Sequence, residues 1–467
     1  MRVKPLVVAL VGLLPSYGMS SALAETLDFK SCVEATLTNN PNMAVSQAQI
    51  AQAKHALAAA KLSRLPQVVA SVTAARSDGA LNVFGMKLQQ RQASLGDFGF
   101  DNNVARQFGA GNYAHEPHNL NYPDAYNNLN TRIEVRIPVW NGGKIGAFQA
   151  QAKAMVQAAT QGEAATQQFL IYNVYQAYEG VHTARAYIEV AKKALAASDA
   201  YVKTTQNLVK QGVVVRSELL NAKVHRAEAM TALEQAKSQE KMALDSLRML
   251  MNQQEMQGLD VGQRIGMSVP FDSVDEMIEV ALQNNPELKA MQKQLVSKQS
   301  AVLAEKASLY PSFNLMVRND WNSDSLSLGE SAYTIAGVAE WKLTDFGVTS
   351  STVGRVRAAA NEEKAKLLSK QNEVRLKVLT AWRNLKVAQK QRNMNQVSVA
   401  QAEEAQRLIM KRYKNGVSTM TEVLATQAQL DKARADLVKS NYEVNLQKAQ
   451  LRLLTGTMSL ASLEVIE

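Results

Sequence analysis

Residues 39–66 of the chain read NNPNMAVSQAQIAQAKHALAAAKLSRLP, and residues 284–311 read NNPELKAMQKQLVSKQSAVLAEKASLYP. Both stretches open with Asn-Asn-Pro and close with proline, 245 residues apart (286 − 41). Two later pairs also match, because Asn141–Gly143 corresponds to Asp345–Gly347 and Gly212 to Gly416, 204 residues apart (416 − 212). A long unit that occurs twice, without a short period, indicates a tandem duplication and not a solenoid.

The duplication divides the chain into a first repeat, 25–260, and a second repeat, 261–467. The first repeat carries 41 extra residues (245 − 204), all between Pro66 and Asn141. We expect this insert, about 78–128, to form an outer loop between two strands. There it would narrow an opening or be a target for phages or antibodies.

The N-terminus has the features of a cleaved export signal. Arg2 and Lys4 precede an apolar run over 6–14, and Ala22–Ala24 supplies the small residues that precede a cleavage site. This run is too short to span a bilayer, so we interpret 1–24 as a signal peptide. No other stretch is apolar enough for a transmembrane helix.

Composition favours long helices. Hydrophobic residues make up 46% of the chain, and only 10 of its 467 residues are proline. None of these prolines lies between Val139 and Val269 or after Pro311. Because an interior proline costs a helix about 3 kcal/mol, both windows can hold very long helices.

Charge and cysteine content exclude some classes of protein. The net charge of +10 is spread among acidic residues without a basic block, which argues against nucleic-acid binding. The single cysteine, Cys32, excludes an internal disulfide framework. We expect Cys32 to be a small buried side chain in the first helix.

Each repeat begins with two helices. Asn40 and Asn285 are the predicted N-caps of the second helix, with proline at the first helical position, where its missing N–H does no harm. That helix should end about 24 residues later, at Pro66 or Pro311.

After these prolines the apolar period changes to two. Strands are predicted at about 67–77 and 129–140 in the first repeat, and at about 311–321 and 331–343 in the second. Their alternation of apolar and charged residues fits either a soluble sandwich or strands that cross an outer membrane. The export signal and the tryptophans at the strand ends, Trp140, Trp321 and Trp341, favour the membrane and its lipid interface.

Four strands cannot close a barrel. An open sheet in lipid would leave two edges of unpaired backbone groups, each costing several kcal/mol. We therefore expect the chain to oligomerise. Three copies would give a barrel of 12 strands, which exceeds the minimum of about eight.

A long helical hairpin follows each strand pair. Helices are predicted over 144–211 and 348–415, each about 100 Å long. Gly212 and Gly416 reverse the chain into return helices over 213–250 and 417–454. A heptad seam supports the second hairpin, formed by Val423, Leu430, Leu437, Val444 and Leu451. Charge interrupts the equivalent first row, which we expect to face a different neighbour: Leu219, Arg226, Leu233, Glu240 and Leu247.

In order and spacing, these features resemble the TolC-like outer membrane factor family. The matching features are the duplicated Asn-Asn-Pro starts, the paired strands before Asn141–Gly143 or Asp345–Gly347, and the two Gly-Val turns. The resemblance covers nearly the whole chain after the signal. It implies a mainly α fold with membrane β: a homotrimer with a long α-helical barrel and a 12-stranded β-barrel, located in the outer membrane of a Gram-negative bacterium with its helices in the periplasm.

The resemblance further implies an exit duct for a tripartite efflux or type I secretion system, working with a periplasmic adaptor and an inner-membrane pump. The family closes its periplasmic end with polar contacts and acidic rings. By position, the aperture residues here are Tyr413, Ser418, Glu422 and Glu218. The adaptor-docking tips are Gly212, Val213, Gly416 and Val417, which also act as helix caps.

Glu422 has two interpretations. One is a single acidic ring at a weakly latched aperture, since Ala425 and Ser418 replace other charged positions of the family. The other is an exposed charge near a helix N-terminus, stabilised by the helix dipole.

Two rival classes fit less well. A periplasmic adaptor would have one hairpin and a compact all-β module, and a trimeric scaffold would lack the second strand pair. No grouping of nucleophile, base and orienting residue indicates an enzyme or a cofactor. His115 and His118 alone are a weak indication of a metal site.

Overall fold

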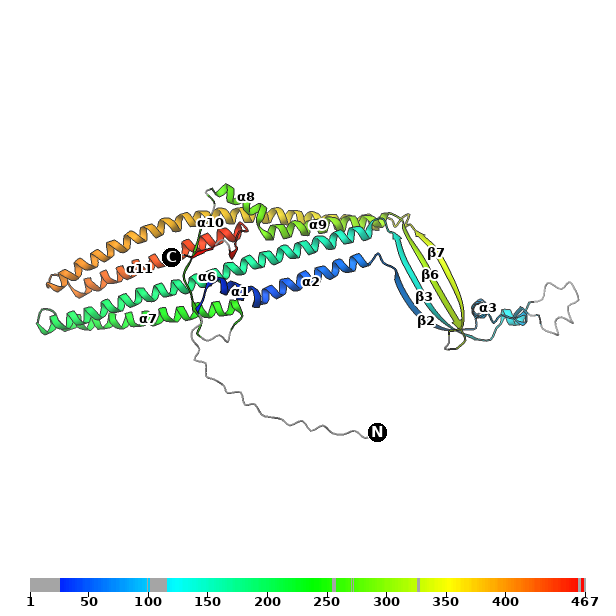
Figure 1. The fold of residues 1–467 in the computed structure, drawn as a ribbon, viewed down its shortest axis with the longest axis horizontal. Coiled ribbons are helices and arrows are strands. Elements are labelled where there is room, and N and C mark those ends of the chain that lie inside the picture. The colour runs from blue at the N-terminus through cyan, green and yellow to red at the C-terminus, as the bar shows by residue number, and fades with distance from the viewer. Residues whose placement is uncertain are drawn as a thin grey trace, which may run out of the picture. The chain divides into compact units, whose positions relative to one another are not determined.

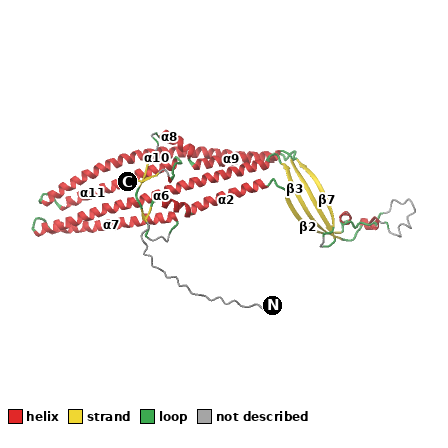
Figure 2. Ribbon diagram, viewed as in Figure 1, coloured by secondary structure: helices red, strands yellow, loops and turns green. Residues whose placement is uncertain are grey.

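The computed structural model describes residues 26–98, 100, 116–253, 258–269, 271, 273–325, 328–460 and 463–465. The predicted signal peptide, 1–24, and His115 lie outside these residues. Long helices and one larger sheet make up most of the described chain (Figures 1 and 2). The fold predicted from the sequence, mainly helical with two strand pairs in a tandem repeat, is confirmed.

The two repeats give the same succession of main elements. The first contains β1 (Thr26–Leu27), α1 (Phe29–Asn39), α2 (Pro41–Leu62), β2 (Gln67–Ser77), α3 (Ala80–Gln89), η1 (Leu95–Phe98), α5 (His118–Asn121), β3 (Tyr126–Trp140), α6 (Lys144–Lys210), α7 (Arg216–Met251) and β4 (Asp260–Val261). The second contains β5 (Ile265–Met267), α8 (Val274–Asn284), α9 (Pro286–Lys306), η2 (Ala307–Leu309), β6 (Ser312–Ser323), β7 (Glu330–Glu340), α10 (Val348–Lys414), α11 (Met420–Leu454) and β8 (Leu463–Val465).

The duplicated asparagines each join two helices. Asn40 accepts a hydrogen bond from the backbone N–H of Asn42 at 2.9 Å, as an N-cap does, and its amide nitrogen donates to the carbonyl oxygen of Leu250 at 2.9 Å. Asn285 donates in the same way to Leu454 O at 3.1 Å. From the junction of the two short helices of its repeat, each side chain therefore satisfies an orphan carbonyl at the C-terminal end of that repeat's return helix, which explains why Asn-Asn-Pro occurs in both repeats.

By packing, the described chain divides into two compact units, each with segments from both repeats. The first includes the segments up to Ser46, Glu163–Pro286 and from Asn372 onwards; the second includes Gln47–Gly162 and Glu287–Gln371. Packing therefore does not follow the boundary near residue 260, and that repeat boundary stays a prediction. None of the described helices combines the length and apolar character needed to cross a bilayer.

The core of the first unit surrounds α1. Phe29 packs edge-on against Tyr175 and Tyr178, with ring centroids 6.0 and 5.4 Å apart. Cys32 is fully buried in this core, as predicted, and burial raises the pKa of its thiol to about 12. The thiol is therefore an inert packing group at neutral pH.

A buried ion pair lies in the same unit. Glu179 has only 2% of its side chain exposed, and it accepts hydrogen bonds from Arg264 Nε at 3.0 Å and from Asn445 at 2.9 Å. This pairing raises the pKa of Arg264. Glu179 thereby links α6 to Arg264, immediately before β5, and to α11.

The second unit contains a four-stranded antiparallel sheet in the order β2-β3-β6-β7. The β3–β6 pairing joins the strand pairs of the two repeats, with Val135 opposite Val317. Strands β2 and β7 form the edges, because each pairs on one side only within the described sheet. The sheet is therefore open.

The register separates the two faces of this sheet by polarity. The polar face carries Ser71, Thr73, Asn128, Asn130, Arg132, Glu134, Arg318, Asp320 and Asn322. The apolar face carries Val68, Val72, Ile133, Val135, Phe313, Leu315, Val317, Tyr333 and Ile335. On the polar face, Arg132 Nε lies 2.6 Å from Asp320 Oδ1. On the apolar face, large side chains such as Val68, Tyr333 and Ile335 are exposed in the single chain.

We predict that Glu179→Ala destabilises the fold by about 3 kcal/mol, because it leaves the partly buried Arg264 guanidinium without its carboxylate. The midpoint of chemical denaturation, followed by helical circular dichroism, measures the change. Glu189→Ala is the matched control, since Glu189 lies on the same helix in an exposed pair with Lys192. Equal midpoints for both variants would contradict a structural role for the buried pair.

Candidate functional site

The candidate site is the end of the first unit where both helical hairpins turn. Gly212 and Gly416 adopt the same left-handed conformation, with φ of 73° in each case. The next N–H in each turn bonds back to the long helix, from Val213 to Leu208 O at 2.9 Å and from Val417 to Arg412 O at 3.0 Å. Both turns are therefore Schellman caps in which glycine takes the conformation that costs other residues most.

The return helices begin three residues later than the sequence indicated, at Arg216 and Met420 and not at Val213 and Val417. After each glycine the chain runs through a short turn to the N-cap, Val215 or Thr419. Because the turn residues stay outside the helix, Val213 and Val417 are exposed, by 52% and 66%. The two tips are neighbours: a Cβ atom on Gly416 would lie 3.7 Å from Val213 Cγ1.

Glu422 and Ser418 form one local group. Thr419 caps α11 by accepting the N–H of Glu422 at 3.3 Å, and the Ser418 hydroxyl donates to the Glu422 carboxylate. Glu422 is exposed in the first turn of α11, where the helix dipole favours a negative charge. The geometry is compatible with both interpretations of Glu422 given above.

Tyr413 and Glu218 form a second group that joins the two hairpins. The Tyr413 hydroxyl lies 3.0 Å from Thr205 Oγ1 on α6 and 3.3 Å from Glu218 Oε2 on α7. Its ring is buried in an apolar cluster, the tip core, and burial raises its pKa. The tip core contains Tyr201, Ala222, Tyr413, Met420, Val423 and Leu424.

A polar chain of side chains lies next to the tip core, and the sequence analysis missed it. Tyr201 OH donates to Gln427 Oε1 at 2.5 Å, and Gln427 Nε2 donates to Asp431 Oδ1 at 2.8 Å. Gln406 donates to the same tyrosine hydroxyl. Burial raises the pKa of Tyr201 to about 12 and that of Asp431 above its ordinary range. The available signal was a glutamine, Gln427, between the seam residues Val423 and Leu430.

The charged row of α7 faces its own hairpin. Arg226 Nε forms an ion pair with Asp199 on α6, and Glu240 Oε1 lies 2.8 Å from Arg185 Nε, also on α6. The expectation that this row faces a different neighbour was therefore wrong. In the second repeat the corresponding row is apolar, and Val423, Leu430, Val444 and Leu451 are buried.

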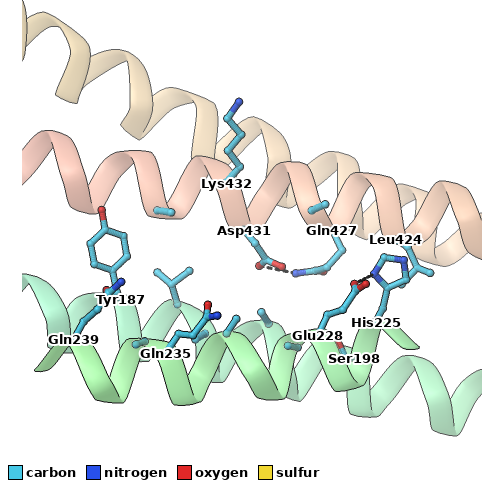
Figure 3. A pocket seen from close by; sticks show the side chains of 18 residues that line it. Tyr187, Ser198, His225, Glu228, Gln235, Gln239, Leu424, Gln427, Asp431 and Lys432 are labelled. Carbon is cyan, nitrogen blue, oxygen red and sulfur yellow. Dashed lines mark hydrogen bonds and ion pairs between the residues drawn. The ribbon is translucent and has the colours of Figure 1, made fainter. Parts of the chain in front are cut away.

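A groove of about 670 Å³ lies between the hairpins, next to this polar chain. Figure 3 shows Gln427 and Asp431 entering it from α11, opposite His225 on α7, whose Nδ1 lies 2.9 Å from Glu228 Oε2 on the same helix. Much of the remaining lining is alanine, namely Ala191, Ala194, Ala229, Ala232, Ala236, Ala428 and Ala435. Small side chains leave room for another helix to approach closely.

The three tryptophans lie at both ends of the sheet. Trp140 ends β3 and contacts the ring of Phe313, with centroids 5.7 Å apart, at the end where the strands connect to α2, α6, α9 and α10. Trp341 follows β7 at the same end and donates to Leu309 O at 3.3 Å. Trp321 lies opposite Thr131 and Ser331, near the loop end. The nine residues from Phe313 to Trp321, about 27 Å along the strand, match the length of a tilted outer-membrane strand.

The described residues contain no group of three His, Cys, Asp or Glu side chains placed to hold a metal ion. His118 stacks obliquely on Tyr122, with centroids 5.3 Å apart.

The outer membrane efflux protein family profile matches residues 32–253 and 277–457. Among solved structures, the chain is similar to CusC, described as forming a transmembrane channel, with 15% identity, 92% of each chain covered and a TM-score of 0.76. It is also similar to the outer membrane protein VceC of Vibrio cholerae, with 16% identity, coverage of 92% of this chain and 96% of VceC, and a TM-score of 0.74. For the outer membrane channel MtrE of Neisseria gonorrhoeae, identity is 16%, coverage is 95% and 94%, and the TM-score is 0.71.

A search of curated protein sequences gave no significant match. The family and the similar structures are efflux and channel proteins rather than enzymes. At these identities the structural similarity establishes the fold.

We predict that Asp431→Asn stabilises the protein at neutral pH, because asparagine can keep the Gln427 hydrogen bond without a buried charge. Burial raises the folded-state pKa of the Asp431 carboxyl, although Arg434, whose Nη1 lies 4.0 Å from Oδ1, opposes the shift. The folded state therefore binds the proton more tightly, and wild-type stability falls as pH rises from the unfolded-state pKa through the folded-state pKa.

Thermal midpoints of the wild type and the variant, measured from pH 4 to 8, should consequently converge towards the acid end. Asp436→Asn is the control, because Asp436 is exposed on the same helix. A difference between Asp431→Asn and wild type that is independent of pH would refute the assignment.

Proposed function

The chain belongs to the outer membrane efflux protein family, and from this we propose that three copies form the passive exit duct of a tripartite efflux or type I secretion system. In this proposal the sheet lies in the outer membrane and the helices extend into the periplasm. A periplasmic adaptor and an inner-membrane pump deliver the cargo and open the duct.

The observation that carries this proposal is the open sheet with one apolar and one polar face. Strands β2 and β7 each present an edge of unpaired N–H and C=O groups, which hydrocarbon does not tolerate. Pairing β7 of one copy with β2 of the next satisfies both edges, and three copies give 12 strands. The exposed apolar face then meets lipid, and the polar face surrounds water.

The helices of the first unit support the same assembly. Exposed apolar residues form a stripe on α10, at successive spacings of 11, 7, 3 and 11 residues: Leu376, Val387, Met394, Val397 and Leu408. A second stripe on α7 contains Leu220, Val224, Met242 and Met249. Two unpartnered stripes on one chain are complementary surfaces for its neighbours in a closed ring.

The hairpin tips supply the moving part of the proposed duct. Tyr413 and Glu218 hold the two hairpins of one chain together, whereas Ser418 and Glu422 lie at the exposed turn of α11. Three copies would place three Glu422 carboxylates around one aperture. In this position they would favour cations.

The adaptor surface is proposed to combine the exposed tips with the alanine-lined groove. Val213 and Val417 offer apolar contacts at the turns. The groove between α7 and α11 is lined by small residues that admit a helix, with His225, Glu228 and Asp431 as polar contacts. These features fit the helical hairpin of an adaptor.

We predict that Glu422→Gln lowers the cation preference of the duct in planar bilayers towards equal permeability, because it removes the ring of negative charge without changing side-chain volume. Glu404→Gln is the matched control, since Glu404 is exposed on α10 and paired with Arg407. Unchanged selectivity in the Glu422→Gln variant would show that Glu422 is an exposed charge stabilised by the helix dipole and not part of a selectivity ring.

We predict that cells lacking the protein accumulate a fluorescent efflux dye, and that the double variant Val387→Asp and Met394→Asp fails to restore export. The added carboxylates would disrupt the α10 stripe against a neighbouring copy. Asn393→Asp with Gln396→Asp, exposed positions outside the stripe, should restore export. If cells without the protein accumulated no more dye than cells that have it, for pump substrates of several classes, this result would argue against an efflux duct.

A further inference from the structure

The insert of the first repeat is folded against the loop end of the sheet. Helix α3 buries Val83, and Phe84 packs edge-on against Phe98 of η1, with centroids 5.1 Å apart. Lys87 and Asp97 form an ion pair between the same two elements. The part of the insert that the structure describes therefore has its own small core.

The end of α3 is attached to the polar face of the sheet. Gln90 is 3% exposed, and its amide nitrogen donates to Asn127 O and to Asn128 Oδ1, both at 2.9 Å. The side-chain oxygen of Gln90, Oε1, accepts a hydrogen bond from Tyr126 OH at 3.0 Å. Asn128 in turn donates to Asn322 Oδ1 on β6, so these contacts lie on the polar face and not in the plane of the sheet.

Arg91 extends the attachment to the far edge. Its Nη1 lies 3.1 Å from Glu330 Oε2, and its Nη2 donates to Ser331 O at 3.2 Å, both on β7. Because β6 separates β3 from β7, the segment crosses about 10 Å of sheet. Arg91 has a φ of 56°, which is uncommon for a residue other than glycine, and Gln92 N–H bonds back to Lys87 O at 2.8 Å in the same turn.

We propose that α3 and residues 90–92 form a fixed constriction on the lumenal side of the outer mouth, which limits the size of solute that passes. The inference rests on the proposed function, in which the polar face lines the lumen. Within one chain the segment reaches from β3 to β7 across that face. Three copies bring three such segments over one opening, so the exit of the duct has its own size filter, separate from the aperture at the hairpin tips.

A lumenal thiol tests the constriction from the outside of the cell, independently of the periplasmic aperture. Ser71→Cys places a cysteine on the polar face, opposite Arg132 on β3. The native Cys32 is fully buried and does not compete for reagent. In intact cells the thiol is exposed to a small charged maleimide or to a maleimide carrying a long polyethylene glycol chain.

In the Ser71→Cys protein, we expect rapid reaction with the small maleimide and slow reaction with the large one. Adding Gln90→Ala and Arg91→Ala should speed the large reagent about tenfold, equivalent to a barrier lower by about 1.4 kcal/mol, and leave the small one unchanged. Arg76→Ala is the matched control, because Arg76 bonds to Asn127 at the same end of the sheet, but its register places it on the apolar face. The exchange Arg91→Glu with Glu330→Arg should keep the slow reaction of the large reagent.

The outcomes separate the two proposals. Equal rates for both reagents in the protein with intact Gln90 and Arg91 would overturn the constriction and leave the lumen assignment standing. Failure of the small reagent to react would overturn the lumen assignment, and the constriction with it. If the small reagent reacts at the same rate in every variant, the sheet itself is intact. A faster reaction of the large reagent then reports a change at the outer mouth only.

Discussion

The unpaired edges of one four-stranded sheet are the constraint on which the structure depends. Strands β2 and β7 each lack a partner on one side in the described chain, and the apolar face between them is exposed. In lipid such edges cannot be hydrated, so the backbone groups need strands from other copies. Oligomerisation is then a condition for placing this sheet in a membrane, and the polar face with its Arg132–Asp320 pair becomes the wall of a shared pore.

The helical unit must also satisfy the polar backbone groups at the ends of its long helices, and both repeats do so in the same way. Asn40 and Asn285 satisfy carbonyl groups at the C-terminal ends of the return helices α7 and α11. Gly212 and Gly416 form the left-handed C-caps of the long helices α6 and α10. The repeats differ in the corresponding rows of the return helices: α11 buries apolar side chains, whereas α7 forms ion pairs to Asp199 and Arg185. This difference gives the chain two dissimilar hairpins from one duplicated unit.

Much of the fold could be predicted from sequence because its signals are local. Proline and glycine positions located the helix ends to within about three residues, and the period of two located the strands β2, β3, β6 and β7. The partners of charged and polar side chains could not be predicted. Helical spacing showed that Arg226 and Glu240 interrupt a row, but not that α6 offers opposite charges. The chain of Tyr201, Gln427 and Asp431, and the position of Gln90 over the sheet, depend on contacts between residues far apart in sequence.

The mass of the intact, detergent-solubilised protein tests the central claim most directly. Light scattering with correction for bound detergent, or native mass spectrometry, counts the chains in a folded particle. The account predicts three chains, with no folded single chain at lower concentration. A stable, folded monomer would show that the sheet does not need partners, and would contradict the shared pore.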